Sequence, residues 1–176
     1  PIRLAPLTVI FGANSAGKSS LGHLLLALQQ TARSTDRKRA LHPGDSSALI
    51  DLGTFADCLH GHDLGQSLKF ELGWTLPKPL EVRDPLAPSN RYQGDHLQLA
   101  VEWVAGKLQQ PEVRAMHYAL SKGGECVLDV AMQRDDERKF SLKSERYGFK
   151  MADGRKWPLE EPDKFYRLSD ITTARF

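Results

Sequence analysis

The chain has 176 residues, 40% of them hydrophobic and 26% charged, and a formal net charge of +2. This composition is ordinary for a soluble globular protein, and the length suits one domain or part of a larger one. A charge this small argues neither for nor against a polyanionic partner. The two cysteines, Cys58 and Cys126, form neither a disulfide framework nor a spaced metal motif, which favours a reducing cytoplasm.

The N-terminus lacks the features of a targeting or membrane segment. No apolar run approaches the roughly 20 residues of a membrane span, and Arg3 and Pro6 interrupt any signal peptide. We therefore expect no membrane partner. The chain opens on Pro1 in what reads as the middle of a strand, and we expect it to be a piece of a longer protein.

The first elements are expected to be a strand and a helix. Residues 7–11 (LTVIF) are almost continuously apolar, which is typical of a strand buried in a parallel sheet. From Lys18 a helical pattern follows, with His23 and Gln30 on the polar face. Its apolar stripe comprises Leu21, Leu24, Leu25 and Leu28 at i, i+3, i+4 and i+7, widened by Leu26.

A strand-rich region begins at Ser67. Turn residues in SKGGE (121–125) and RDDER (134–138) predict a hairpin and a loop tip. Residues 77–95 are rich in proline and predict a loop, and the tail from Trp157 to Phe176 shows no clear period. The strands are expected in segments 67–76, 95–106, 112–121, 125–135 and 139–151.

One motif is specific. The segment GANSAGKS, from Gly12 to Ser19, matches the phosphate-binding pattern G-x-x-x-x-G-K-[ST] between a predicted strand and a predicted helix. Glycines let successive backbone N–H groups curl around a β-phosphate, and the start of the helix adds its positive dipole end. The alternative is a glycine-rich turn that carries a lysine by accident.

Each residue type in the motif suits a part of Mg²⁺-ATP. The Lys18 ammonium can bridge β- and γ-phosphate oxygens, and Lys18 is therefore also the candidate catalytic residue. The Ser19 hydroxyl is a hard ligand for Mg²⁺, and Ser20 can donate to the α-phosphate. The predicted nucleotide site comprises Gly12, Ala13, Asn14, Ser15, Ala16, Gly17, Lys18, Ser19 and Ser20.

The loop interior carries a family resemblance. GANSAGKSS, with Asn14 third and two serines after Lys18, resembles the G-x-N-x-x-G-K-S-S/T form of ABC-type ATPases, within these the SMC/RecF/OLD-nuclease branch of bacterial AAA-family proteins. The likeness covers Ile2 to about Leu72. It implies an α/β P-loop fold, with a parallel strand–P-loop–helix unit and following loop at 1–66, an antiparallel β-subdomain at 67–151, and a linker or next subdomain from 152 to 176.

The resemblance also implies parts that this sequence lacks. Such ATPases hydrolyse ATP in a head-to-tail dimer, with a signature motif and a Walker B Asp-Glu pair. Asp129 ends a predicted strand but is followed by Val130, and LSKGGE (120–125) reads as a hairpin rather than a signature. We expect the catalytic second half to lie beyond Phe176, so that this chain alone binds nucleotide and turns it over poorly.

Three further groups of residues are candidates for a Q-loop, a metal site and a base-stacking surface. The family's Q-loop region, here 51–63, holds no glutamine, and Asp51, Asp57 or His60 are its candidate substitutes. Cys58, His60, His62 and Asp63 could suggest a metal site, but a loop explains their spacing better. The aromatic residues favour a core over base stacking; they are Trp74, Trp103, Trp157, Tyr92, Tyr118, Tyr147 and Tyr166.

A basic cluster follows the predicted helix and could meet DNA phosphates or form a solvated loop. It comprises Arg33, Arg37, Lys38 and Arg39, with Asp36 and Asp45 partly offsetting the charge.

Three functions are compatible with the sequence. The first is an ATPase head in which Mg²⁺-ATP joins two copies and hydrolysis releases them, serving a nuclease or other effector in bacterial DNA repair or anti-phage defence. The second is a P-loop GTPase or small-molecule kinase, against which stand the missing N/T-K-x-D and D-x-x-G segments and the absence of an evident lid. The third is a module that binds ATP without hydrolysing it and signals by dimerising.

Overall fold

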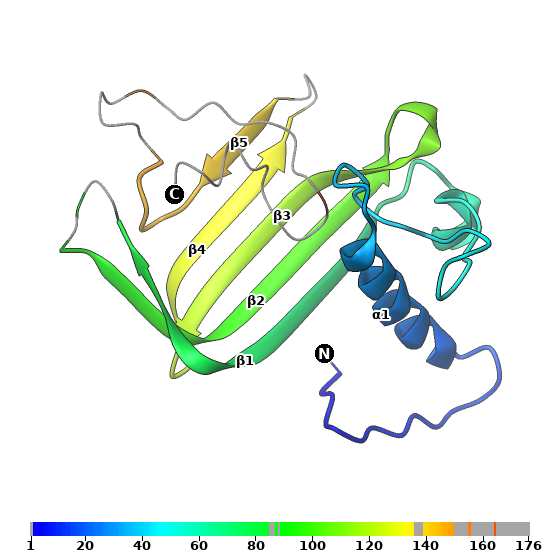
Figure 1. Ribbon diagram of the computed structural model, residues 1–176, viewed down its shortest axis with the longest axis horizontal. Coiled ribbons are helices and arrows are strands. Elements are labelled where there is room, and N and C mark those ends of the chain that lie inside the picture. The colour runs from blue at the N-terminus through cyan, green and yellow to red at the C-terminus, as the bar shows by residue number, and fades with distance from the viewer. Residues whose placement is uncertain are drawn as a thin grey trace.

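The computed structural model describes residues 2–84, 87, 89–135, 139–149, 155 and 164. In this part of the chain, one long helix and three short 3₁₀ helices accompany a five-stranded antiparallel sheet (Figure 1). The strands lie side by side in chain order. The elements are α1 (Lys18–Arg33), η1 (Ala56–Cys58), η2 (His60–His62), β1 (Leu68–Arg83), β2 (Arg91–Ala105), η3 (Lys107–Gln109), β3 (Pro111–Lys122), β4 (Glu125–Arg134) and β5 (Phe140–Lys143).

The hairpin between β3 and β4 confirms the turn that the sequence predicts. Gly123 and Gly124 have φ angles of 59° and 87°, the left-handed conformations that a tight two-residue hairpin turn requires and that glycine adopts without steric cost. The pairing places Tyr118 opposite Val130 and Leu120 opposite Leu128. The segment LSKGGE is therefore strand–turn–strand, as predicted, and not the loop-to-helix setting of a signature motif.

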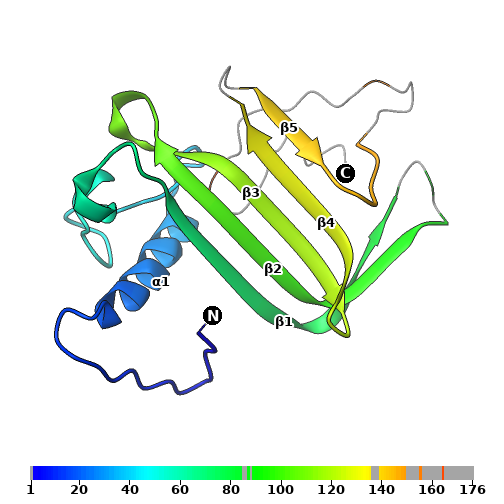
Figure 2. The ribbon, with the colours of Figure 1, turned by 180° about the vertical axis from the view of Figure 1, so that it is seen from behind.

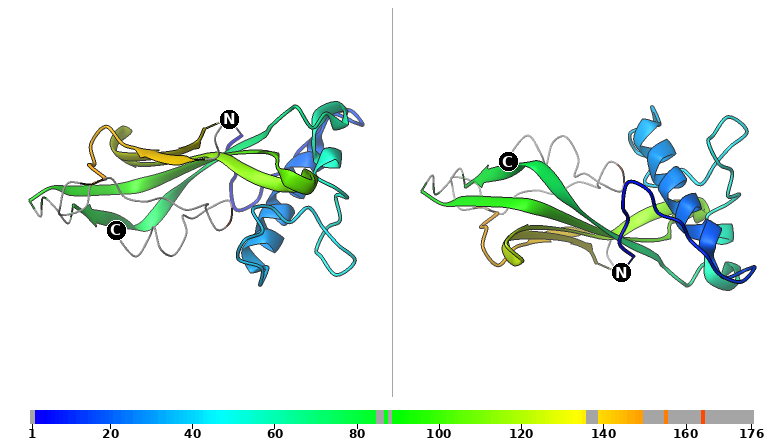
Figure 3. Two further views of the ribbon diagram at one scale, coloured as in Figure 1. Left: turned by 90° about the horizontal axis from the view of Figure 1, so that it is seen from above. Right: turned by 90° about the horizontal axis from the view of Figure 1, so that it is seen from below.

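One face of the sheet carries the core. Because side chains alternate along a strand, Leu97, Leu99, Val101 and Trp103 of β2 share a face. Trp103 is fully buried and stacks on Phe70 of β1 with ring centroids 5.0 Å apart. Helix α1 and segment 34–66 cover one end of this face, as the view from behind and the views from above and below show (Figures 2 and 3).

A second, smaller cluster lies around Leu120, Leu128 and Tyr147. The Tyr92 hydroxyl donates a hydrogen bond to the Arg146 carbonyl at 2.5 Å, which ties β2 to the segment after β5. Tyr147 also packs against Phe149, with ring centroids 5.1 Å apart. Trp103, Tyr92, Tyr118 and Tyr147 thus serve packing, as expected, whereas Trp74 is 39% exposed. Trp157 and Tyr166 lie outside the described residues.

The expected α/β P-loop fold is wrong. The structure describes residues 2–17 without helix or strand, so the parallel strand–P-loop–helix unit does not form around residues 7–11. The physical reason is the lack of a partner: a parallel strand needs neighbouring strands for its N–H and C=O groups, and β1–β5 pair only with one another. Leu7 and Phe11 are instead 84% and 88% exposed.

The boundaries of three strands, β1, β2 and β5, also differ from the prediction. Residues 77–95 were expected to form a loop, but β1 continues through Pro77 and Pro79 to Arg83, and β2 begins at Arg91. A register shift between Thr75 and Leu80 accommodates the prolines, which cannot donate to a ladder. A strand was also expected at 139–151; within its described part, 139–149, β5 covers Phe140–Lys143.

Within the described residues, the structure contains no helix with both the length and the apolar character needed to cross a membrane.

Candidate phosphate-binding loop and adjoining hollow

The loop of the motif leads directly into α1, as the sequence predicts. The helix begins at Lys18, and Gly17 before it has a φ of 78°, a left-handed conformation that disfavours other residues. Ser15 also has a positive φ, of 61°. Alternation of left- and right-handed residues is the geometry in which backbone N–H groups converge on an anion.

No side chain of the described first turn neutralises the positive end of the α1 dipole. Gly17 provides no side-chain cap, and the described first turn contains no acidic residue. The first N–H groups of a helix have no intrahelical acceptor, and they carry the positive end of its dipole. An anion is the natural partner for such an end.

The Lys18 side chain folds back over the loop. Its Nζ donates hydrogen bonds to the carbonyl oxygens of Gly12 at 2.9 Å and Ala13 at 2.5 Å. The ammonium group therefore lies across the mouth of the loop, held by neutral acceptors that a stronger anionic acceptor can replace. Ser19 and Ser20, the predicted ligands of Mg²⁺ and the α-phosphate, are both exposed in the first turn of α1.

A hollow adjoins the start of α1. It measures about 240 Å³ and lies between α1, η1 and the first residue of β1. We call it the α1–η1 hollow; its lining comprises Ser20, His23, Leu24, Ala27, Leu41, Leu52, Asp57, Cys58 and Leu68. Of the predicted site residues, the hollow brings together Ser20 of the loop and Asp57 of the Q-loop region, while Asp51 and His60 are not part of its lining.

Asp57 is held in place by its neighbours. Its Oδ2 accepts hydrogen bonds from the backbone N–H and the hydroxyl of Thr54, both at 2.7 Å. The Oδ1 lies 3.2 Å from His62 Nδ1. The Thr54 hydrogen bonds, followed by the charge of His62, lower the pKa of the Asp57 carboxyl below its ordinary value, so the group is an anion and a hydrogen-bond acceptor at neutral pH.

The Cys58–Asp63 stretch runs from the end of η1 through η2 and is not arranged as a metal site. Burial, and secondarily the charge of Asp57, raises the pKa of the Cys58 thiol, whose Sγ lies 3.6 Å from the Thr54 carbonyl oxygen. Asp63 accepts from Gly65 N and Gln66 Nε2, which lowers the pKa of its carboxyl. Among the described residues, no group of three or more His, Cys, Asp or Glu side chains is placed to hold a metal ion.

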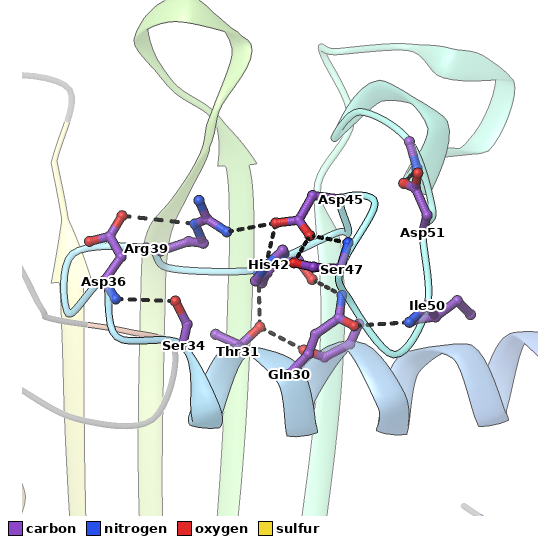
Figure 4. Close-up of polar contacts among 12 residues, drawn as sticks. Gln30, Thr31, Ser34, Asp36, Arg39, His42, Asp45, Ser47, Ile50 and Asp51 are labelled. Carbon is purple, nitrogen blue, oxygen red and sulfur yellow. Dashed lines mark hydrogen bonds and ion pairs between the residues drawn. The ribbon is translucent and has the colours of Figure 1, made fainter.

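The far end of α1 is fixed by a polar network that the sequence did not predict (Figure 4). Gln30 was expected on the exposed face, but it is only 6% exposed. Its Nε2 donates to the His42 carbonyl at 2.6 Å, and its Oε1 accepts from Ile50 N at 3.1 Å. Thr31 Oγ1 accepts from His42 N at 2.8 Å. Glutamine at a helix surface gives no sequence signal that distinguishes solvent from a loop backbone as its partner.

Lys164 caps the same end of α1. Its Nζ donates to the carbonyl oxygens of Thr31 at 3.0 Å, Ser34 at 2.8 Å and Ala32 at 3.4 Å. These carbonyls belong to the helix end, where a cation offsets the negative end of the dipole. The contacts join residues 130 to 133 positions apart, which no local sequence pattern could indicate.

The basic cluster after α1 is partly neutralised. Arg39 lies 3.8 Å from Asp36 and 4.0 Å from Asp45, as the neighbouring acidic residues suggested. These pairs are surface contacts at the edge of ion-pair distance, so they weaken the local positive field rather than remove it. Contact with DNA stays a prediction.

No protein-family model, curated protein or solved structure matches this chain. The resemblance to ABC-type ATPases therefore rests on the motif residues themselves.

Proposed function

We propose that the Gly12–Ser20 loop binds the phosphates of Mg²⁺-ATP, and that the chain is the ATP-binding part of an ATPase of the SMC/RecF/OLD-nuclease kind. The observation that carries the proposal is the position of Lys18: its ammonium group closes the loop by bonding to Gly12 and Ala13 carbonyls, directly before an uncapped helix start. Loop, cation and helix end together favour an anion with several negative charges.

Each residue would take one task on binding. Lys18 would exchange its two carbonyl acceptors for β- and γ-phosphate oxygens, which bind an ammonium more strongly. The Ser19 hydroxyl would coordinate Mg²⁺, whose other ligands would be phosphate oxygens and water. Ser20 would donate to the α-phosphate. None of these tasks requires a side chain from the sheet.

In this proposal ATP joins two copies of the ATPase, and hydrolysis releases them to drive an effector such as a nuclease in DNA repair or anti-phage defence. Hydrolysis requires a carboxylate that activates water and a partner group facing the γ-phosphate. None of the five described strands ends in an Asp-Glu pair. We therefore expect this chain alone to bind ATP with little turnover.

Calorimetry with Mg²⁺-ATP tests the proposal. Lys18→Ala should weaken binding by about 30-fold or more, since truncating one partner of a close charge pair costs about 2–5 kcal/mol. Lys107→Ala is the matched control, because Lys107 is an exposed lysine of η3 and its loss should leave affinity unchanged. Equal affinity of the wild type and Lys18→Ala would overturn the proposal, and GTP binding far better than ATP would favour a GTPase instead.

A further inference from the structure

The α1–η1 hollow adjoins the phosphate-binding loop at Ser20. Ser20, Leu24 and Ala27 lie at i, i+4 and i+7, so they share one face of α1, and all three line the hollow. Ser20 is also the last residue of the proposed phosphate site. The hollow therefore runs from that site along α1 for about 10 Å, at 1.5 Å per residue.

The walls of the hollow suit a flat, apolar group. Five of its nine lining residues are aliphatic; they are Leu24, Ala27, Leu41, Leu52 and Leu68. Its volume of about 240 Å³ lies below the range of roughly 300–1,000 Å³ that holds a whole drug-sized ligand. The space fits one portion of a nucleotide, with the phosphates outside it at the loop.

The polar groups of the hollow are few and have defined chemistry. The Asp57 carboxylate is an acceptor anchored through Oδ2 by Thr54. The exposed His23 presents an imidazole ring at the same hollow, and bases stack on such rings. An acceptor beside apolar walls and a planar side chain suits a base whose edge donates hydrogen bonds.

We propose that the α1–η1 hollow binds the base of the nucleotide, and that Asp57 selects adenine by accepting a hydrogen bond from its 6-amino group. This inference rests on the proposed function, because the phosphates at Gly12–Ser20 place the base beside Ser20. In the register that presents position 6 to Asp57, a carbonyl oxygen there, as in hypoxanthine, faces another acceptor and is disfavoured.

Alkylation of the wild-type chain tests the site without a substitution. Cys58 lines the hollow, and Cys126 lies exposed at the start of β4, so the chain carries its own control thiol. N-ethylmaleimide modification, mapped by mass spectrometry, should slow at Cys58 by about tenfold or more when Mg²⁺-ATP is saturating. The rate at Cys126 should not change. Mg²⁺-tripolyphosphate, which has no base, should protect neither cysteine.

Filling the hollow provides the second test. Cys58→Phe should weaken Mg²⁺-ATP binding by about tenfold or more and leave Mg²⁺-tripolyphosphate binding unchanged. Cys126→Phe is the matched control and should alter neither affinity. Thermal unfolding of both variants shows that a loss of binding is not a loss of folding.

The base preference is the third readout. Wild-type chain should bind ATP about tenfold or more tightly than ITP, which carries oxygen in place of the 6-amino group. Asp57→Asn should narrow that ratio, because an amide can donate to the oxygen. If ATP binds but neither protects Cys58 nor responds to Cys58→Phe, the base assignment is overturned while the proposed function stands. If neither ATP nor tripolyphosphate binds, the proposed function itself fails.

Discussion

Apolar side chains of similar type are buried in the sheet but exposed in the N-terminal segment. In the sheet, Trp103 is fully buried and Phe70 is 7% exposed. In segment 2–17, which precedes α1, Phe11 is 88% exposed and Leu7 is 84% exposed. Both regions read as strands in the sequence, yet only one of them forms strands.

An apolar, β-branched pattern favours a strand, but the strand forms only where neighbouring strands can pair with it. β1–β5 find their partners by short connections within the chain, and antiparallel neighbours need only tight turns. A strand of the parallel kind needs partners brought by long crossovers. The sheet therefore finds its partners within the chain, whereas segment 2–17 leaves Leu7, Val9 and Phe11 exposed.

The two tryptophans on neighbouring strands give the largest expected effect. Trp103→Ala should lower the free energy of unfolding by about 3–5 kcal/mol, because a large buried ring leaves a cavity in the main core. Trp74 of β1 is 39% exposed, so Trp74→Ala is the matched control and should cost much less. Urea denaturation measures both. Equal losses would show that the two ends of the sheet are not packed as described.

The junction between α1 and the following loop gives an intermediate effect. Gln30→Ala should lower the free energy of unfolding by about 2–4 kcal/mol, since it leaves the buried His42 carbonyl and the partly buried Ile50 N–H without their partner. Hydrogen-exchange measurements should show faster exchange of the Ile50 amide, which in the wild type donates a hydrogen bond to Gln30 Oε1. Gln29, exposed on the same helix, provides the control: Gln29→Ala should change neither value.

The N-terminal segment gives the smallest effect. Phe11→Ala should change the free energy of unfolding by less than about 0.5 kcal/mol, because an exposed side chain loses no packing. Phe70→Ala, the same change in the sheet, should cost about 3–5 kcal/mol. A large loss in Phe11→Ala would show that segment 2–17 packs against the rest of the chain in solution.

Sequence reasoning worked where the signal was local. The alternation in Leu97–Trp103 predicted the buried face of β2, and the Gly123–Gly124 pair predicted the β3–β4 turn. The start of α1 after Gly17 followed from the motif, which needs a helix at that place. In each of these cases neighbours in sequence are also neighbours in space.

Sequence reasoning failed where distant groups decide the outcome. The strand predicted at 7–11 lacks a partner, and the partners of Gln30 and the cap of α1 by Lys164 come from other segments. The hollow beside Ser20 was also missed, although Asp57 was among the candidate residues. Its walls come from α1, segment 41–58 and β1, which only the tertiary structure brings together.

The prolines in β1 disfavour the association of this strand with a strand of another copy of the protein. β1 is an outer strand of the sheet, and an open outer strand invites another chain to add to it. Pro77 and Pro79 offer no N–H group to such an addition, and the irregularity between Thr75 and Leu80 disturbs the backbone geometry it would need. The part of β1 around Pro77 and Pro79 is thereby protected from pairing with strands of other copies, as occurs in fibrils.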